Sequence, residues 1–106
     1  METESIVKGL GAVKGTATGK AVEVDDPKFK EGDVLVAFMT TPDHIAKMKL
    51  ASAFITEVGS ITCHAAIVAR EMGKPCIVRA GTDLWKSVGN IVTVSVADYK
   101  ENSIRW

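Results

Sequence analysis

The sequence has few cysteines, no excess of either charge and no long hydrophobic run, and each absence excludes a class of protein. Its two cysteines, Cys63 and Cys76, have neither the number nor the spacing of a disulfide framework or a zinc site. Thirteen basic side chains balance thirteen acidic ones, and no basic cluster indicates a nucleic acid partner. The apolar runs are too short to cross a membrane, and the N-terminus lacks the basic start of a signal peptide. We therefore expect a cytoplasmic protein without a membrane partner.

The composition is that of an ordinary globular domain. Hydrophobic residues make up 46% of the chain and charged residues 25%, which is the usual balance of a folded soluble protein. A chain of 106 residues can bury one core but not two, so we expect a single domain over residues 1–106. A complete small protein and a domain excised from a longer enzyme fit these residues equally well.

Apolar patterning predicts a mixed α/β domain. Glycines interleaved with valines over residues 7–22 predict short strands joined by tight turns. Further strands are predicted at residues 34–38, 53–58, 76–78, 91–96 and 103–106. One helix is expected to start at Thr41, Pro42 and Asp43, and a second to run from about 62 to 72 and end at Gly73. Because each of these two main helices follows a buried strand, we expect helices covering the faces of a mixed sheet.

His64 is the leading candidate for a functional residue. It lies in the first turn of the second predicted helix, where unpaired amides and the helix dipole favour an anion. A neutral imidazole there is a nucleophile that can accept a phosphoryl group. Ile67 and Val68 share its helical stripe, however, so a hydrogen-bonded core histidine is the competing interpretation.

The neighbours of His64 allow several roles. Thr62 can cap the helix, and its hydroxyl can also bond the imidazole and select the free ring nitrogen. Cys63 is conceivable as a thiol nucleophile only if His44 lies close enough to act as its base. Arg70 can assist phosphate binding, although its position six residues after His64 puts it on a different helical face.

Two other kinds of site are not expected. His64, Cys63 and Cys76 do not form a metal site, because adjacent helical side chains rarely converge on one ion and no fourth ligand is evident. No glycine-rich loop carries the lysine and hydroxyl that hold nucleotide phosphates. The sequence therefore predicts a chain that carries a phosphoryl group without generating one.

Residues 59–75 read Gly-Ser-Ile-Thr-Cys-His-Ala-Ala-Ile-Val-Ala-Arg-Glu-Met-Gly-Lys-Pro. This segment, extended to residue 78, resembles the phosphohistidine signature of the phosphoenolpyruvate-utilising enzymes. That family includes phosphoenolpyruvate synthase, pyruvate phosphate dikinase and enzyme I of the sugar phosphotransferase system. Segments at 15–19, 33–36, 41–43 and 53–57 resemble the same domain, so the similarity covers essentially the whole chain.

The resemblance implies a swivelling β/β/α domain that relays a phosphoryl group. His64 corresponds to the histidine phosphorylated on Nε2, and Thr62 to a threonine that hydrogen-bonds it. The implied partners are a nucleotide-binding domain and a phosphoenolpyruvate/pyruvate-binding domain, in the same or a separate chain. Magnesium and nucleotide would bind those partners, so no cofactor is expected on this domain, which alone should show little or no turnover.

Two residues depart from the family pattern. Ser60 replaces the second glycine of a pair, and Arg79 stands where relatives usually have glycine. Ser60 could donate a hydrogen bond near the phosphate, and Arg79, like Arg70 and Cys63, could support it. The same departures leave open a second hypothesis, an interaction or regulatory module that keeps the fold but transfers nothing.

Overall fold

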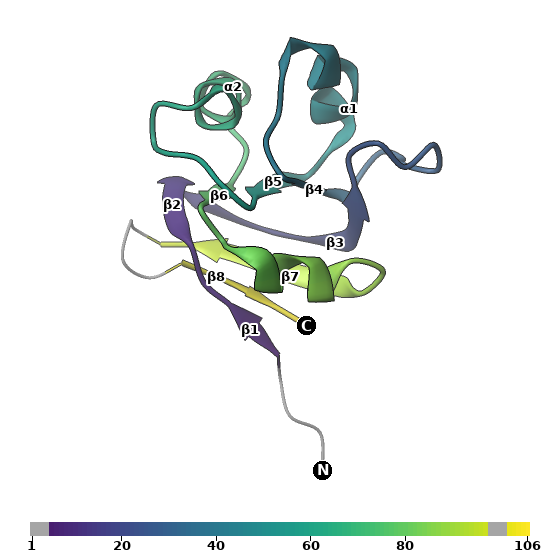
Figure 1. The fold of residues 1–106 in the computed structure, drawn as a ribbon, viewed down its shortest axis with the longest axis vertical. Coiled ribbons are helices and arrows are strands. Elements are labelled where there is room, and N and C mark those ends of the chain that lie inside the picture. The colour runs from purple at the N-terminus through teal and green to yellow at the C-terminus, as the bar shows by residue number, and fades with distance from the viewer. Residues whose placement is uncertain (1–4, 98–101) are drawn as a thin grey trace.

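The longest strand, β3 (Gly15–Glu23), joins two groups of strands into one eight-stranded mixed sheet (Figure 1). The computed structural model describes residues 5–97 and 102–106, so the N-terminal residues that bear on the signal-peptide prediction lie outside the described part. The other strands are β1 (Ile6–Val7), β2 (Leu10–Val13), β4 (Val34–Ala37), β5 (Ala53–Thr56), β6 (Cys76–Val78), β7 (Ile91–Val96) and β8 (Asn102–Arg105). The α-helices are α1 (Ile45–Leu50) and α2 (His64–Met72), and the 3-10 segments are η1 (Pro42–His44) and η2 (Thr82–Ser87).

The strand order is β1-β8-β7-β3-β4-β5-β6-β2. Strands β3, β4, β5 and β6 pair in parallel, and the remaining pairs are antiparallel. The first six residues of β3 pair with β7, and its last three pair with β4. One long strand therefore replaces the short strands and turns predicted around residues 15–22.

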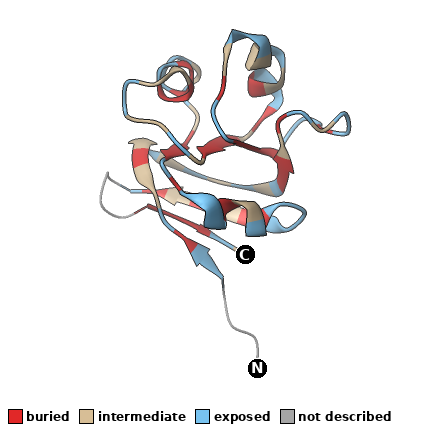
Figure 2. Cartoon of the chain, in the orientation of Figure 1, coloured by how far each residue is buried: buried red, intermediate tan, exposed pale blue. Residues whose placement is uncertain are grey.

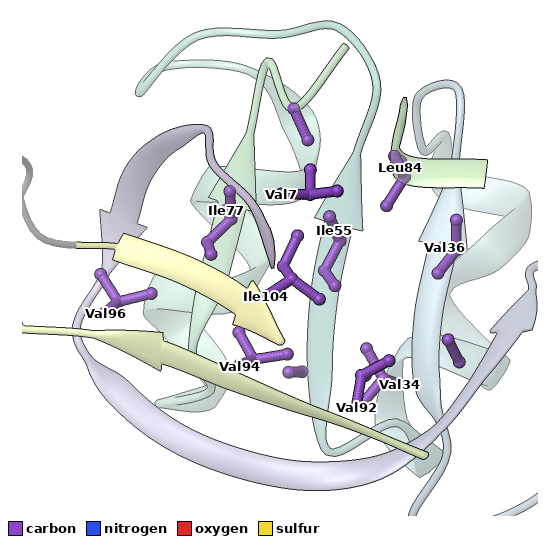
Figure 3. Packing of buried hydrophobic residues seen from close by; sticks show 13 residues of the cluster. Val7, Val34, Val36, Ile55, Ile77, Leu84, Val92, Val94, Val96 and Ile104 are labelled. Atoms are coloured by element: carbon purple, nitrogen blue, oxygen red, sulfur yellow. The ribbon is translucent and has the colours of Figure 1, made fainter. Parts of the chain in front are cut away.

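Alternating side chains of the parallel strands enter two separate hydrophobic clusters. In β4, Val34 and Val36 belong to the first cluster, whereas Leu35 and Ala37 belong to the second. Figure 3 shows the first cluster, in which they meet β7, β8 and Leu84 of η2. The second cluster lies beneath α1 and α2, which cover the same face of the sheet (Figure 1). Burial on both faces explains why β4 and the first three residues of β5 are continuous apolar runs (Figure 2).

Most predicted elements are confirmed, including the four C-terminal strands to within a few residues and Gly73 as the left-handed end of α2. The predicted start of α2 is wrong by two residues, because the helix begins at His64 and Cys63 is its N-cap. The 3-10 segment η2 was not predicted, since its short sequence has no helical apolar period. No helix in the described part of the chain is long and apolar enough to cross a membrane.

Candidate functional site

The candidate site lies where three parallel strands end at one edge of the sheet. Because β4, β5 and β6 are parallel neighbours, the loops that follow them emerge side by side, which is where α/β sheets commonly bind ligands. Backbone hydrogen bonds continue past the strand ends, from Val58 N to Phe38 O at 3.2 Å and from Ala80 N to Thr56 O at 3.0 Å. Backbone hydrogen bonds alone thus connect the three loops at this edge.

The loop after β5 turns sharply at Gly59 and leads into α2. Gly59 has φ of 136°, and a Cβ there would lie 3.0 Å from Sγ of Cys63. Only glycine suits this combination of positive φ and close approach. The turn is closed by a hydrogen bond from Cys63 N to Ser60 O at 3.1 Å, after which Cys63 becomes the N-cap and His64 the first helical residue.

The imidazole of His64 is held by a threonine from the neighbouring loop. Its Nδ1 lies 2.8 Å from Oγ1 of Thr40, just beyond the end of β4. Thr40 is buried, whereas His64 is of intermediate exposure and belongs to neither hydrophobic cluster. Within the described part of the chain, Nδ1 is the only ring nitrogen of His64 with a hydrogen-bond partner. A cavity of about 100 Å³ adjoins the ring and is lined by Met39, Thr40, Thr56, Val58, Gly59, Cys63, His64 and Ala65.

Thr62 occupies a different position from the one predicted. Its hydroxyl lies 3.1 Å from Oγ of Ser60, and its N–H donates to that same serine oxygen at 3.3 Å. Cys63, not Thr62, is the N-cap of α2, so the predicted cap is wrong by one residue. In this structure the hydroxyl that contacts the imidazole belongs to Thr40, which the sequence reasoning missed. The available signal was a threonine two residues after the apolar strand predicted at 34–38.

The thiols are not arranged for nucleophilic catalysis with His44. Nδ1 of His44 accepts a hydrogen bond from Thr41 N at 3.0 Å, and its Nε2 lies 3.5 Å from Oδ1 of Asp25. His44 is therefore committed to the start of the η1–α1 segment and offers no ring nitrogen to Cys63. Burial raises the pKa of Cys76 to about 12, so that thiol stays protonated near neutral pH. Among the described residues, no group of three or more His, Cys, Asp or Glu side chains is placed to hold a metal ion.

Both candidate arginines donate hydrogen bonds to the loop that precedes His64. Nη2 of Arg70 donates to Ile61 O at 2.9 Å, and Nε of Arg79 donates to Gly59 O at 3.1 Å. Both side chains are exposed. They line, together with Ser60, a hollow of about 560 Å³ that is distinct from the small cavity beside His64. The structure thus joins Ser60, Arg70 and Arg79 in one place and Cys63 with His64 in another.

Comparison with known proteins identifies the family of the chain. The family model described as "PEP-utilising enzyme, mobile domain" matches residues 29–98. The chain belongs to this family. The mobile domain is 50% identical over 82 residues to a probable phosphoenolpyruvate synthase of Methanothermobacter thermautotrophicus, covering 74% of this chain and 12% of that protein. It is 51% identical over 81 residues to the phosphoenolpyruvate synthase of Pyrococcus furiosus, covering 73% and 10%.

The resemblance to the phosphoenolpyruvate-utilising family is thereby confirmed. The mobile domain spans only about one-tenth to one-eighth of the length of these curated relatives. Among solved structures, a UPF0107 protein determined by solution NMR matches with a TM-score of 0.62 at 14% identity, covering 96% of this chain and 97% of that one. That likeness concerns the fold alone.

Arg79 has its backbone in the left-handed region, which favours glycine. Its φ is 56°, and it is the only non-glycine residue with positive φ in the described part of the chain. The left-handed region destabilises a folded residue that has a Cβ by about 1–2 kcal/mol. Glycine avoids this strain, but part of its advantage is offset because it loses more conformational entropy on folding. Arg79→Gly should therefore be more stable than Arg79→Ala by about 1 kcal/mol.

Urea unfolding of the two variants measures this difference, since both lack the hydrogen bond to Gly59 O and differ only in the Cβ. Equal unfolding free energies would show that the left-handed backbone at residue 79 carries no strain.

Proposed function

We propose that this mobile domain is a phosphoryl carrier in which Nε2 of His64 accepts a phosphoryl group from one partner and passes it to another. The observation that carries the proposal is the 2.8 Å contact between Nδ1 of His64 and Oγ1 of Thr40. A hydrogen bond that fixes one ring nitrogen decides which nitrogen is free to react. With Nδ1–H donating to Thr40, the lone pair is on Nε2.

The transfer itself is a simple displacement. The Nε2 lone pair attacks phosphorus in line, the N–P bond forms, and the bond from phosphorus to the donor oxygen breaks with its electron pair leaving on that oxygen. Nδ1–H remains bonded to Thr40 throughout. The reverse displacement by an acceptor oxygen restores neutral His64, so one residue serves both half-reactions.

The acquired negative charge would lie close to the start of α2. Cys63 makes no side-chain hydrogen bond to the helix, so the amides of the first turn are not capped by a side chain. Such amides and the positive end of the helix dipole stabilise a phosphate dianion. Placing the nucleophile at the first helical residue therefore assists acceptance without any metal bound to this domain.

Exposed apolar side chains around His64 supply a surface for partners. This apolar rim consists of Phe38, Met39, Val58, Ile61 and Ile67, whose side chains are between 37% and 53% exposed. Met39 and Val58 line the cavity beside His64, and Ile67 lies one helical turn after it. Exposed apolar residues gathered near one site are typical of protein–protein contacts. A partner docked here would also exclude water from the phosphohistidine.

A charge placed in the apolar rim should slow transfer without harming the fold. Ile67→Glu puts a carboxylate at the interface, where desolvation and repulsion of phosphate both oppose docking, so transfer should fall at least about tenfold. Ile91→Glu is the matched control, since Ile91 is 64% exposed on β7, outside the rim. The measurement is the rate of labelling by a partner. Equal rates for the two variants would contradict a docking role for the rim.

The short span of this chain relative to its relatives supports partners elsewhere. We infer a nucleotide-binding partner and a phosphoenolpyruvate- or pyruvate-binding partner, with magnesium and nucleotide held by them. The domain would swivel between the two, as a β/β/α module covering residues 1–106. Alone it should show little turnover.

The test is transfer of labelled phosphoryl groups. The chain is incubated with labelled phosphoenolpyruvate or ATP and the remaining domains of a related synthase from which the mobile domain has been deleted. The proposal predicts an adduct that is acid-labile and base-stable, as expected for phosphohistidine. An acid-stable adduct, or none with either donor, would contradict it.

A further inference from the structure

We propose that Ser60, Arg70 and Arg79 form a second anion site, separate from His64, that binds the phosphate group of an organic phosphate. These three side chains line the hollow of about 560 Å³ described above. Its remaining walls are residues 10–12 of β2 and Ile61. The cavity beside His64 has a different lining, so the two sites would be neighbours on one loop.

The two arginines give the hollow a positive charge, and no acidic side chain among the described residues pairs with it. Neither arginine takes part in an ion pair found in the described part of the chain, and none of the described residues lining the hollow is acidic. Each guanidinium has five N–H donors. Arg70 donates one hydrogen bond to Ile61 O, and Arg79 donates one to Gly59 O. The other donors are available to a ligand, and the carbonyl contacts hold the guanidinium groups in place.

The backbone at Arg79 is strained. Its φ of 56° is one that glycine adopts without strain. Backbone strain at a side chain that points into a hollow is typical of binding sites, where the surrounding structure maintains it. We therefore expect the side chain of Arg79 to have a function besides its single hydrogen bond to Gly59 O.

The donor set suits phosphate better than carboxylate. One guanidinium satisfies a carboxylate with two parallel hydrogen bonds, whereas two guanidinium groups and the Ser60 hydroxyl can surround a tetrahedral dianion. The hollow is far larger than a phosphate ion and falls within the usual range of small-molecule sites. Its apolar wall of Leu10 and Ile61 suits an organic body attached to the phosphate.

This site does not depend on transfer through His64. The test is therefore performed on the unphosphorylated chain, by following backbone amide resonances during titration with AMP, with pyrophosphate and with inorganic phosphate. AMP should shift the amides of residues 10–12, 60 and 61, and bind more tightly than inorganic phosphate. The same affinity is expected in His64→Ala, so a failure here leaves the carrier proposal standing.

Variants identify the arginines as the ligands. Arg70→Gln and Arg79→Gly should each weaken AMP binding about tenfold or more, and glycine at 79 suits the existing backbone. Lys28→Gln is the control for loss of one exposed positive charge, because Lys28 lines a different hollow, and it should bind AMP as the parent chain does. The site is overturned if millimolar AMP and pyrophosphate shift none of these amides, or if both arginine variants retain the parent affinity. Equal affinity for AMP and inorganic phosphate would overturn the assignment of an organic body.

Discussion

His64→Ala is expected to reduce phosphoryl labelling of the chain to background, whereas His44→Ala is expected to retain it. Removal of His64 takes away the only imidazole at the site, and no other side chain replaces an attacking nitrogen. His44 is the matched control because its two ring nitrogens face Thr41 N and Asp25 instead. The measurement is incorporation of label from phosphoenolpyruvate or ATP in the presence of partner domains.

The fold of His64→Ala should remain intact, because His64 is partly exposed and lies outside both hydrophobic clusters. Circular dichroism and urea unfolding establish this point before labelling is compared. Cys63→Ala should keep the label as well, since the neighbouring thiol has no assigned part in transfer. Label that persists in His64→Ala, or that disappears in Cys63→Ala, would contradict the proposed nucleophile.

Thr40→Val is expected to slow transfer about 10- to 100-fold while leaving the domain folded. Valine keeps the shape of threonine but removes the oxygen that contacts Nδ1 of His64 at 2.8 Å. A lost hydrogen bond at a partly buried group costs about 1–3 kcal/mol, a range that includes the roughly 1.4–2.7 kcal/mol of a 10- to 100-fold loss in rate. Without it, the ring is free to rotate and to carry its proton on Nε2, where it blocks attack.

Two readouts separate this positioning role from a structural one. Nitrogen NMR of the imidazole should show the proton on Nδ1 in the parent chain and divided between the two nitrogens in Thr40→Val. Thr62→Val should cost less than Thr40→Val, because the Thr62 hydroxyl contacts Ser60 in this structure. The same proton position on the imidazole in the parent chain and in Thr40→Val would contradict a positioning role for Thr40. A larger loss of transfer rate in Thr62→Val than in Thr40→Val would assign that role to Thr62.

The fold was largely predictable because its signals are local. Strand β4 and the first three residues of β5 are short apolar runs, and their burial on both faces follows from helices on one side and strands on the other. Gly73 and Pro75 mark the end of α2 through chemistry that needs no distant partner. The single long strand β3 was less visible, since its glycines suggested turns and its continuity depends on pairing with β7.

The site was predictable only in part, because half of it comes from another strand. His64 stands at a helix start that its own neighbours define, whereas Thr40 reaches it through parallel pairing, with Ala37 opposite Thr56. A register of this kind depends on tertiary structure and has no local signature. Similarly, the departure at Arg79 was visible in the sequence, but its left-handed backbone and its place beside Arg70 required the structure.

The most direct test of the carrier role is to locate the phosphorus on the phosphorylated chain. Protein labelled with nitrogen-15 in histidine is phosphorylated by a partner and studied by phosphorus–nitrogen correlated NMR. The predicted result is a single N–P bond at Nε2 of His64, with the proton retained on Nδ1 beside Thr40. Phosphorus on Nδ1 of His64, on His44, or on an oxygen of Thr62 or Ser60 would contradict the account.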